Sequence, residues 1–156
     1  MKIAIMGLRH GHVGDLIARI RDRDNTELVA ICEEDAATRE AAQPNHDLPI
    51  YDSYEKMLDE VECDAIGIGD YFGKRGAIAI TALERGKHVI ADKPLCTSLA
   101  ELDTIAELAR AKQLSIGCML DMRDGAAFLA LRALADGGEL GREHAISFGG
   151  PHPLNW

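Results

Sequence analysis

The stretch that decides the fold class is KIAIMGLRHGHVG, residues Lys2–Gly14. Its first five residues are typical of a buried strand, and they lead directly into a turn rich in glycine. In dinucleotide-binding domains such a turn lets the backbone approach a pyrophosphate, which lies against the positive end of the next helix. The usual spacing G-x-G-x-x-G requires glycine at three positions that hold Gly7, Arg9 and His12 in this chain. The turn therefore predicts a dinucleotide site with altered phosphate contacts.

The arginine in this turn allows two interpretations. Its side chain would obstruct the close approach of the pyrophosphate, or its guanidinium would pair with a phosphate. We expect four residues of the turn to surround the pyrophosphate: Gly7, Arg9, His10 and Gly11. Either His10 or His12 would donate a hydrogen bond there. We expect no metal site, because two imidazoles two residues apart need not converge and the spacing specifies no third ligand.

Short apolar runs and helical patterns alternate along the chain. Four further apolar runs follow at 28–32, 65–68, 88–91 and 115–120. Amphipathic patterns typical of helices occur at 13–20, 35–42, 53–58, 76–85 and 99–109. Ser98 and Glu101 form a capping box at the start of the last of these, and Gly86 follows the end of the one before it. The alternation predicts an α/β fold with a doubly wound parallel sheet, the Rossmann fold.

The last third of the chain departs from this rhythm. A helical pattern at 126–135 ends at two glycines, and residues 145–148 could form a final strand. We expect residues 1–120 to form a dinucleotide-binding Rossmann domain. Residues 121–156 would be a trailing helix and strand that lead to a second, absent domain, so that the chain is truncated. An ordinary flexible tail is the alternative.

The composition excludes several classes of partner. The 156 residues include 17 Lys and Arg against 26 Asp and Glu, a formal net charge of −9. Nucleic acid is not expected as a partner, because phosphate backbones require a positive face. No stretch approaches the roughly 20 apolar residues of a membrane span, and the four cysteines form no C-x-x-C pair. We expect reduced thiols, a cytoplasmic protein and no membrane partner.

Acidic residues follow the second apolar run. Glu33 stands at the end of that run, where a carboxylate can accept hydrogen bonds from both ribose hydroxyls of an adenosine. Glu34 and Asp35 add negative charge where NADP carries its 2′-phosphate, so NAD is expected rather than NADP. The alternative is that these acids belong to the solvated first turn of a helix, where they complement the helix dipole.

Lys93 is the candidate catalytic residue. It follows the apolar run at 88–91, at the edge where open α/β sheets bind their ligands. A lysine there can polarise a substrate hydroxyl or carbonyl while a hydride moves, and Asp92 could orient its ammonium group. The alternative is a surface lysine before a helix. Three further residues at this edge are expected to line the cofactor: Asp70, Tyr71 and Pro94.

The glycine turn, the acid after the second run and the block GKHVIADKP at Gly86–Pro94 resemble the Gfo/Idh/MocA oxidoreductases. That family includes glucose–fructose oxidoreductase and inositol 2-dehydrogenase. The resemblance extends from Lys2 to about Gly141, and Gly86–Pro94 is its most specific part. It implies NAD(P)-dependent hydride transfer to or from a sugar, cyclitol or related polyol. It also implies that Lys93 is the catalytic lysine, with Asp92 where glutamate is commoner, and that Glu33 is the ribose-binding acid.

Two further departures from the family bear on activity. The segment after the third apolar run reads DYFGKR, at 70–75, where the family has T-P-N-x-x-H. The second-domain aspartate and histidine that complete the family's proton relay would lie beyond residue 156. We therefore expect the 156-residue chain to be catalytically incompetent alone, and exposure of the surface that the second domain covers predicts a homo-oligomer. The alternative function is a non-catalytic nucleotide-binding or interaction module.

Overall fold

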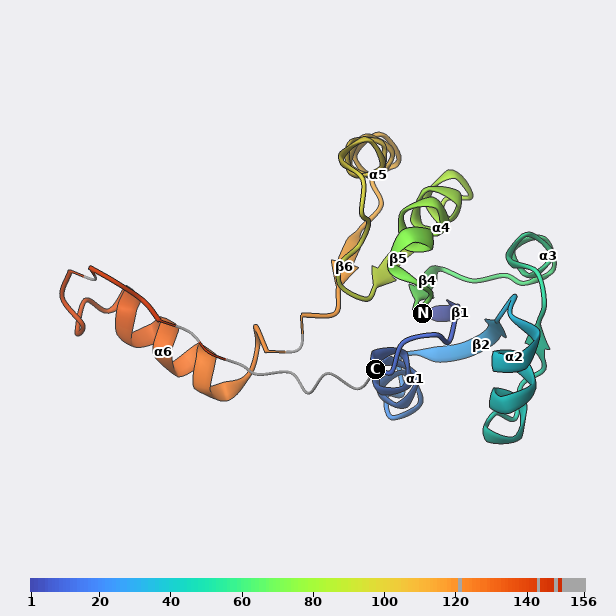
Figure 1. Ribbon diagram of the computed structural model, residues 1–156, viewed down its shortest axis with the longest axis horizontal. Helices are drawn as coiled ribbons and strands as arrows, with labels where there is room; N and C mark the ends of the chain where they lie inside the picture. The colour runs from blue at the N-terminus through green and yellow to red at the C-terminus, as the bar shows by residue number, and fades with distance from the viewer. Residues whose placement is uncertain (121, 143, 148, 150–156) are drawn as a thin grey trace. The chain divides into compact units, whose positions relative to one another are not determined.

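The computed structural model describes residues 1–120, 122–142, 144–147 and 149. The chain divides into two units, Met1–Met119 and Leu120–Trp156. In the first unit strands and helices alternate along the chain and wind around one sheet (Figure 1).

The strands of the first unit form a single parallel sheet in the order β3-β2-β1-β4-β5-β6. Their bounds are β1 (Lys2–Met6), β2 (Glu27–Cys32), β3 (Ile50–Tyr51), β4 (Ala65–Ile68), β5 (His88–Ala91) and β6 (Ile116–Cys118). This order is that of doubly wound dinucleotide-binding folds and confirms the predicted fold class. Only β3 was not predicted, because its two residues are too few to show a periodic pattern.

The helices of this unit begin and end near the predicted positions. Their bounds are α1 (His12–Arg21), α2 (Ala36–Ala42), α3 (Tyr54–Glu60), α4 (Phe72–Glu84) and α5 (Leu99–Lys112), with a 3-10 turn, η1 (Gln43–Asn45). The side chains of Asp35, Ser53 and Ser98 each accept the backbone N–H three residues ahead, which satisfies an unpaired donor at a helix start. Helix α4 begins four residues before its predicted start at 76, because glycines at 73 and 76 weaken the helical pattern there.

Alternate residues of β1 face the two sides of the sheet. Ala4 and Met6 belong to the larger core cluster, which α3, α4 and α5 complete. Ile3 and Ile5 belong to a smaller cluster that packs against the buried side chains of α1. Both clusters are formed by mostly aliphatic side chains with little exposed surface, so the sheet is a rigid platform for the turns at its edges.

The carboxyl ends of β1 and β4 meet at one point. Gly7 follows β1 with a φ of +83°, and a Cβ on it would lie 2.5 Å from the Cβ of Asp70. A side chain at position 7 is therefore excluded by both backbone strain and a steric clash. Between β1 and β4 the chain connections diverge to opposite faces of the sheet, and folds of this class bind ligands at that switch point.

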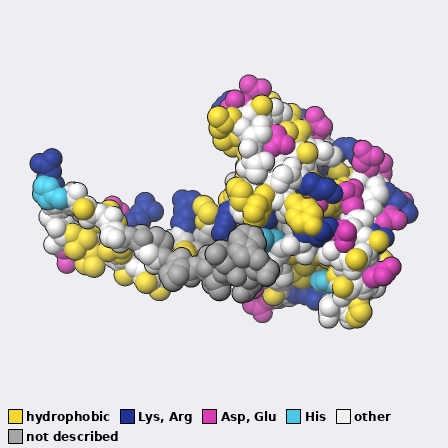
Figure 2. Space-filling model, in the orientation of Figure 1, with side chains coloured by type: hydrophobic (Ala, Val, Ile, Leu, Met, Phe, Trp, Pro, Cys, Tyr) yellow, Lys and Arg dark blue, Asp and Glu magenta, His cyan; other side chains and the backbone are white. Residues whose placement is uncertain are grey.

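The second unit contains α6 (Ala126–Asp136). Apolar side chains gather along this segment in the space-filling view (Figure 2), and Leu129, Leu131 and Leu134 are 50%, 52% and 39% exposed. Residues 144–147 are not in a strand, and Phe148, the last residue of the predicted final strand, lies outside the described residues. The division after residue 119 does not by itself test the predicted domain boundary at 120.

The four cysteines carry free thiols, and Cys32 and Cys63 are buried. Burial raises the pKa of the Cys32 thiol to about 12, so this thiol is not ionised at neutral pH. Among the described residues, every helix is too short or too polar to cross a lipid bilayer.

Candidate functional site

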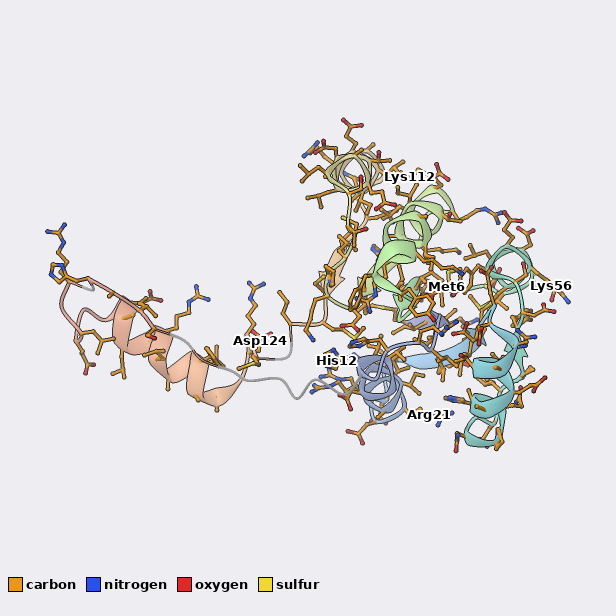
Figure 3. All side chains as sticks on the ribbon, in the orientation of Figure 1. Met6, His12, Arg21, Lys56, Lys112 and Asp124 are labelled. Atoms are coloured by element: carbon orange, nitrogen blue, oxygen red, sulfur yellow. The ribbon has the colours of Figure 1, made fainter. Side chains whose placement is uncertain are left out.

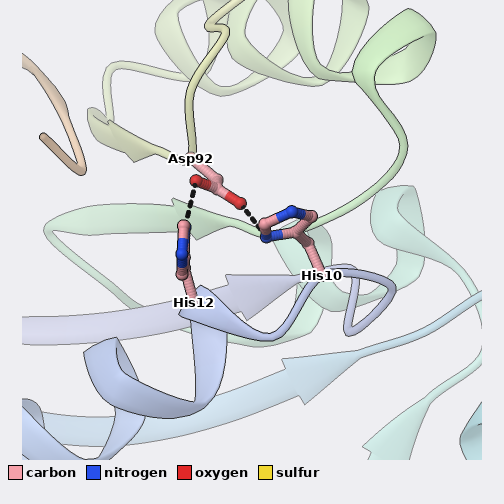
Figure 4. Close-up of side chains that lie close together, drawn as sticks. All are labelled: His10, His12 and Asp92. Atoms are coloured by element: carbon pink, nitrogen blue, oxygen red, sulfur yellow. Dashed lines mark hydrogen bonds and ion pairs between the residues drawn. The ribbon is translucent and has the colours of Figure 1, made fainter. Parts of the chain in front are cut away.

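The carboxylate of Asp92, at the end of β5, lies between the imidazole rings of His10 and His12 (Figure 4). It has no exposed surface. Its Oδ1 lies 3.0 Å from Nδ1 of His12 and accepts the backbone N–H of Lys93 at 2.8 Å. Its Oδ2 accepts an N–H from Nη2 of Arg75 at 3.1 Å, and Nδ1 of His10 lies against the same oxygen, outside hydrogen-bond geometry. Groups from three separate segments thus converge on one buried carboxylate.

These contacts keep the carboxylate charged. Burial alone would raise the pKa of the Asp92 carboxyl, but the contact with His12, the hydrogen bond from the N–H of Lys93 and the charge of Arg75 lower it below its usual value. Burial also lowers the pKa of His10, against the opposing effect of Asp92. The site at neutral pH therefore combines an ionised carboxylate with a His10 that is largely uncharged.

Arg75 joins the end of β4 to the end of β5. Its guanidinium has no exposed surface, and its Nε donates to the carbonyl oxygen of Asp70 at 2.7 Å. Its Nη1 donates to the carbonyl oxygens of Lys93, at 2.7 Å, and Pro94, at 3.3 Å. Arg75 was not among the predicted site residues. The available signal was its place on the buried face of α4, four residues before Ala79.

The ammonium group of Lys93 points toward the turn after β1. Its Nζ lies 2.8 Å from Nδ1 of His12 and 3.4 Å from Nε2 of the same ring. His12 is the first residue of α1 and Arg21 is the last, and both are labelled in Figure 3. Lysine, imidazole and Asp92 therefore form a continuous chain of polar contacts between β5 and the predicted phosphate turn.

Glu33 joins the turn after β1 to the turn after β2. Only 1% of the residue is exposed. Its Oε2 accepts the backbone N–H of Leu8 at 2.7 Å, and its Oε1 accepts that of Asp35 at 2.9 Å. Because each carboxylate oxygen can accept more than one hydrogen bond, the ribose contact stays a prediction. The bracing of the turn after β1 against the turn after β2 was not predicted.

Arg9 lies across three loops. Its guanidinium carbon is 4.0 Å from the centroid of the Tyr71 ring, and its Nη2 donates to the Tyr71 hydroxyl. Its Nη1 lies 3.4 Å from Oδ2 of Asp35. Arg9 thus contacts an aromatic ring and a carboxylate, whereas one interpretation of the sequence paired its guanidinium with a phosphate.

Asp70 is buried and fixes the start of the loop that follows β4. It accepts the hydroxyl of Tyr54 at 2.6 Å and the backbone N–H of Tyr71 at 2.7 Å. Burial, with the hydrogen bond to Asp70, raises the pKa of the Tyr54 hydroxyl far above its usual value, so this hydroxyl remains a donor. Asp70 therefore positions Tyr71 and is itself covered, with 1% of its surface exposed.

The turn before α1 fits a diphosphate. Within the described residues, the backbone N–H groups of residues 9 to 12 have no hydrogen-bond acceptor, whereas that of Val13 binds the carbonyl of His10. A Cβ on Gly11 would meet nothing within 4 Å, and a Cβ on Gly69 would lie 2.6 Å from the Cβ of Val13. The helix start is thus open on its outer side and packed directly against the end of β4. Unpaired N–H groups at the positive end of a helix are a ready site for an anion.

The two histidines converge, although their spacing did not require it. The ligand atoms of His10, His12 and Asp92 lie within 4.8 Å of one another, and Asp92 is 80 residues beyond His12. Two cations already contact this set, since Arg75 binds Oδ2 of Asp92 and Lys93 contacts Nδ1 of His12. Positive charge at the atoms that a divalent ion would use disfavours such an ion. The absence of a metal here stays a prediction.

Comparison with known proteins identifies the first unit. The model of an oxidoreductase family with an NAD-binding Rossmann fold, GFO_IDH_MocA, matches residues 1–119. A dTDP-3,4-didehydro-2,6-dideoxy-alpha-D-glucose 3-reductase from Saccharopolyspora spinosa is 28% identical over 97% of this chain and 46% of its own length. An inositol 2-dehydrogenase from Salmonella paratyphi B is 24% identical over 91% of this chain and 43% of its own length. The chain thus spans less than half the length of the curated relatives that it matches.

Solved structures agree on the fold. A myo-inositol 2-dehydrogenase from Lactobacillus plantarum superposes with a TM-score of 0.78 at 25% identity, over 91% of this chain and 42% of that one. The WlbA dehydrogenase from Bordetella pertussis, solved with NADH and UDP-GlcNAcA, superposes with a TM-score of 0.83 at 21% identity, over 90% of this chain and 43% of that one. The latter likeness bears on the fold alone.

Proposed function

Because the chain belongs to the Gfo/Idh/MocA family of oxidoreductases and contains their NAD-binding Rossmann domain, we propose that it takes part in hydride transfer between NAD and a sugar, cyclitol or related polyol. The observation that carries the proposal is the position of Lys93. From the end of β5, its ammonium group points toward the turn that precedes α1, where it contacts His12. A donor in that position lies beside the ligand edge of the sheet, where it can bind the oxygen of a reacting C–O group.

The proposal gives each part of the cofactor a place. The diphosphate would lie on the backbone N–H groups of residues 9 to 12, and the adenosine ribose beside Glu33. Glu34 and Asp35 supply the negative charge that favours NAD over NADP. The nicotinamide, when bound, accepts or returns the hydride, and Lys93 with Asp92 would stand at that end of the site.

Lys93 would act as a general acid or base at the substrate oxygen. In the oxidising direction its amine takes the hydroxyl proton, and in the reducing direction its ammonium donates one. Arg75 fixes the main chain around the lysine through the carbonyl oxygens of Lys93 and Pro94. The substrate class is supported by two relatives, which are named for a dTDP-sugar and for inositol.

A non-catalytic nucleotide-binding or interaction module is the second candidate. Its support is Arg9, which contacts Tyr71 and Asp35 on the side where the adenosine would bind, so that a cofactor must displace it.

A homo-oligomer is proposed from the exposed leucines of α6, and a cytoplasmic location from the free cysteines.

Calorimetric titration with NAD, NADH and NADP separates the two functions. The dehydrogenase proposal expects saturable binding of NAD or NADH, weaker binding of NADP, and binding of a sugar or cyclitol by the NAD-saturated protein. Absence of dinucleotide binding at millimolar concentration would refute it and would favour the interaction module.

A further inference from the structure

One nitrogen of His12 is shared between two partners of opposite charge. Nδ1 lies 2.8 Å from Nζ of Lys93 and 3.0 Å from Oδ1 of Asp92. A ring nitrogen either accepts a hydrogen bond or donates one, so Nδ1 cannot serve both partners in one protonation state. We propose that His12 exchanges a proton with Lys93 and thereby supplies the lysine as the neutral amine that accepts the substrate's hydroxyl proton. This inference rests on the proposed function.

The contacts define two states of the pair. In the first, the ammonium of Lys93 donates to Nδ1 of an uncharged His12. In the second, the proton is on Nδ1, where it is held by Oδ1 of Asp92, and Lys93 is an amine. The pair carries one positive charge in both states, so the exchange moves charge by a single hydrogen-bond length inside the site.

The surrounding charges favour this exchange. The Asp92 carboxylate, without exposed surface, stabilises the imidazolium of the second state. Arg75 binds the other oxygen of the carboxylate and keeps it ionised. The His10 ring lies edge-on to that of His12, with centroids 4.7 Å apart, and burial keeps it largely uncharged, so it does not add a competing cation. The groups that face His12 are therefore one anion, one fixed cation and the lysine.

The proton and electron balance is complete within the proposed reaction. In oxidation the substrate C–H bond breaks and its electron pair leaves with the hydrogen as a hydride to the cofactor. The hydroxyl proton moves to the Nζ lone pair, and the C=O bond forms. The imidazolium of the second state then releases its Nδ1 proton to water, because the His12 ring is partly exposed, and the pair returns to the first state with the substrate's proton on Nζ. His12 acts on the substrate only through Lys93 and is a positioning residue in that sense.

The purely structural alternative predicts a different tautomer. If His12 only ties the turn to β5, its Nδ1 carries hydrogen and donates to Asp92 whether or not Lys93 is present. ¹⁵N NMR of the imidazole rings distinguishes the two cases in the protein without cofactor, with the His12 signal assigned by its loss in His12→Gln. When the His12 ring is uncharged, we expect an unprotonated Nδ1 that accepts from Lys93, and a protonated Nδ1 in Lys93→Met. A protonated Nδ1 in both proteins would overturn the inference.

The reactivity of the Lys93 amine gives an independent readout. Trace acetylation with acetic anhydride at neutral pH measures the amine fraction of each lysine, with exposed Lys56 on α3 as the internal reference. His12→Gln removes the proton acceptor and is expected to slow the labelling of Lys93 by about tenfold, the factor that one pH unit makes in a protonation equilibrium. His46→Gln, which changes a histidine of the segment after η1, is the matched control and should leave the rate unchanged.

The outcomes separate the two proposals. Equal labelling of Lys93 in wild type and His12→Gln, with intact binding of NAD, would overturn the exchange and leave the proposed function standing. An intact exchange in a protein that binds no dinucleotide would instead refute the proposed function.

Discussion

Arg75 and Asp92 form an ion pair in which neither side chain has exposed surface, with Nη2 3.1 Å from Oδ2. The guanidinium comes from α4 and the carboxylate from the end of β5, so the pair joins two elements at the ligand edge. The remaining N–H groups of Arg75 bind carbonyl oxygens of Asp70, Lys93 and Pro94. The buried guanidinium is therefore paired with a carboxylate and also hydrogen-bonded to backbone carbonyl oxygens. These partners together explain how an arginine is accommodated in the core.

Removal of this arginine should be costly. Arg75→Met leaves the Asp92 carboxylate buried without its ion-pair partner, and we expect a loss of about 3 kcal/mol in the free energy of unfolding. Arg85→Met removes an exposed ion pair with Asp59 at the end of the same helix and should cost less than about 1 kcal/mol. Urea unfolding measures both. Equal losses in the two variants would contradict the structural role of Arg75.

Acid should destabilise the protein in two stages. The pKa values of His10 and Asp92 are both lowered on folding, so each group binds protons more readily in the unfolded chain. The stability linked to His10 is complete above the ordinary histidine pKa of 6.5 and is lost as pH falls through the folded value. That linked to Asp92 is lost only below the ordinary aspartate pKa of 3.8. Unfolding free energies measured from about pH 7 to about pH 3 should show both stages. Burial also lowers the pKa of His46, so the first stage should become smaller in His10→Gln without vanishing, and a first stage of unchanged size there would count against this assignment.

The two glycines of the turn should differ in tolerance. Gly7→Ala introduces a Cβ 2.5 Å from that of Asp70 at a positive φ, and we expect destabilisation of about 2 kcal/mol or more. Gly11→Ala places its Cβ in open space at an ordinary φ and should cost less than about 1 kcal/mol. Thermal unfolding of the two variants checks the difference. A Gly7→Ala protein as stable as Gly11→Ala would show that the β1 and β4 ends are not in contact.

Glu33 should matter to both folding and binding. Glu33→Gln converts one acceptor oxygen into an NH2 group, so the N–H of Leu8 or Asp35 loses its partner, at a cost of about 1–3 kcal/mol in stability. NAD affinity should fall by roughly tenfold, because the braced turn and the predicted ribose acceptor are both altered. Glu34→Gln, at the exposed neighbour, is the control for stability and should be close to wild type. Unchanged stability in Glu33→Gln would contradict the bracing of the two turns.

The local pattern of the sequence predicted the strands that form the centre of the sheet. The bounds of β1, β4 and β5 agree with the apolar runs at 2–6, 65–68 and 88–91, because these strands are covered on both faces and need apolar residues throughout. The short β3 was not predicted, because two residues are too few to show a periodic pattern. The first turn of α4 was not predicted, because its glycines weaken the helical pattern.

The contacts of the site depend on strand order, which local patterns do not report. β4 lies between β1 and β5, and only this order brings the turn with His12 to the end of β5 with Lys93, 81 residues away. Lys93 and Asp92 were predicted because they belong to a specific motif at a strand end. Arg75 was not, because a buried arginine becomes intelligible only when the carbonyl groups around it are known.

The central claim is that the turn between β1 and α1 binds the diphosphate of NAD through its backbone. The most direct test is a titration of the ¹⁵N-labelled protein with NAD, followed by the amide resonances of residues 9 to 12. We predict that these four resonances shift together and saturate, and that the shifts are much smaller in Glu33→Gln at the same NAD concentration. Amide resonances in this turn that stay unchanged at millimolar NAD would contradict the claim.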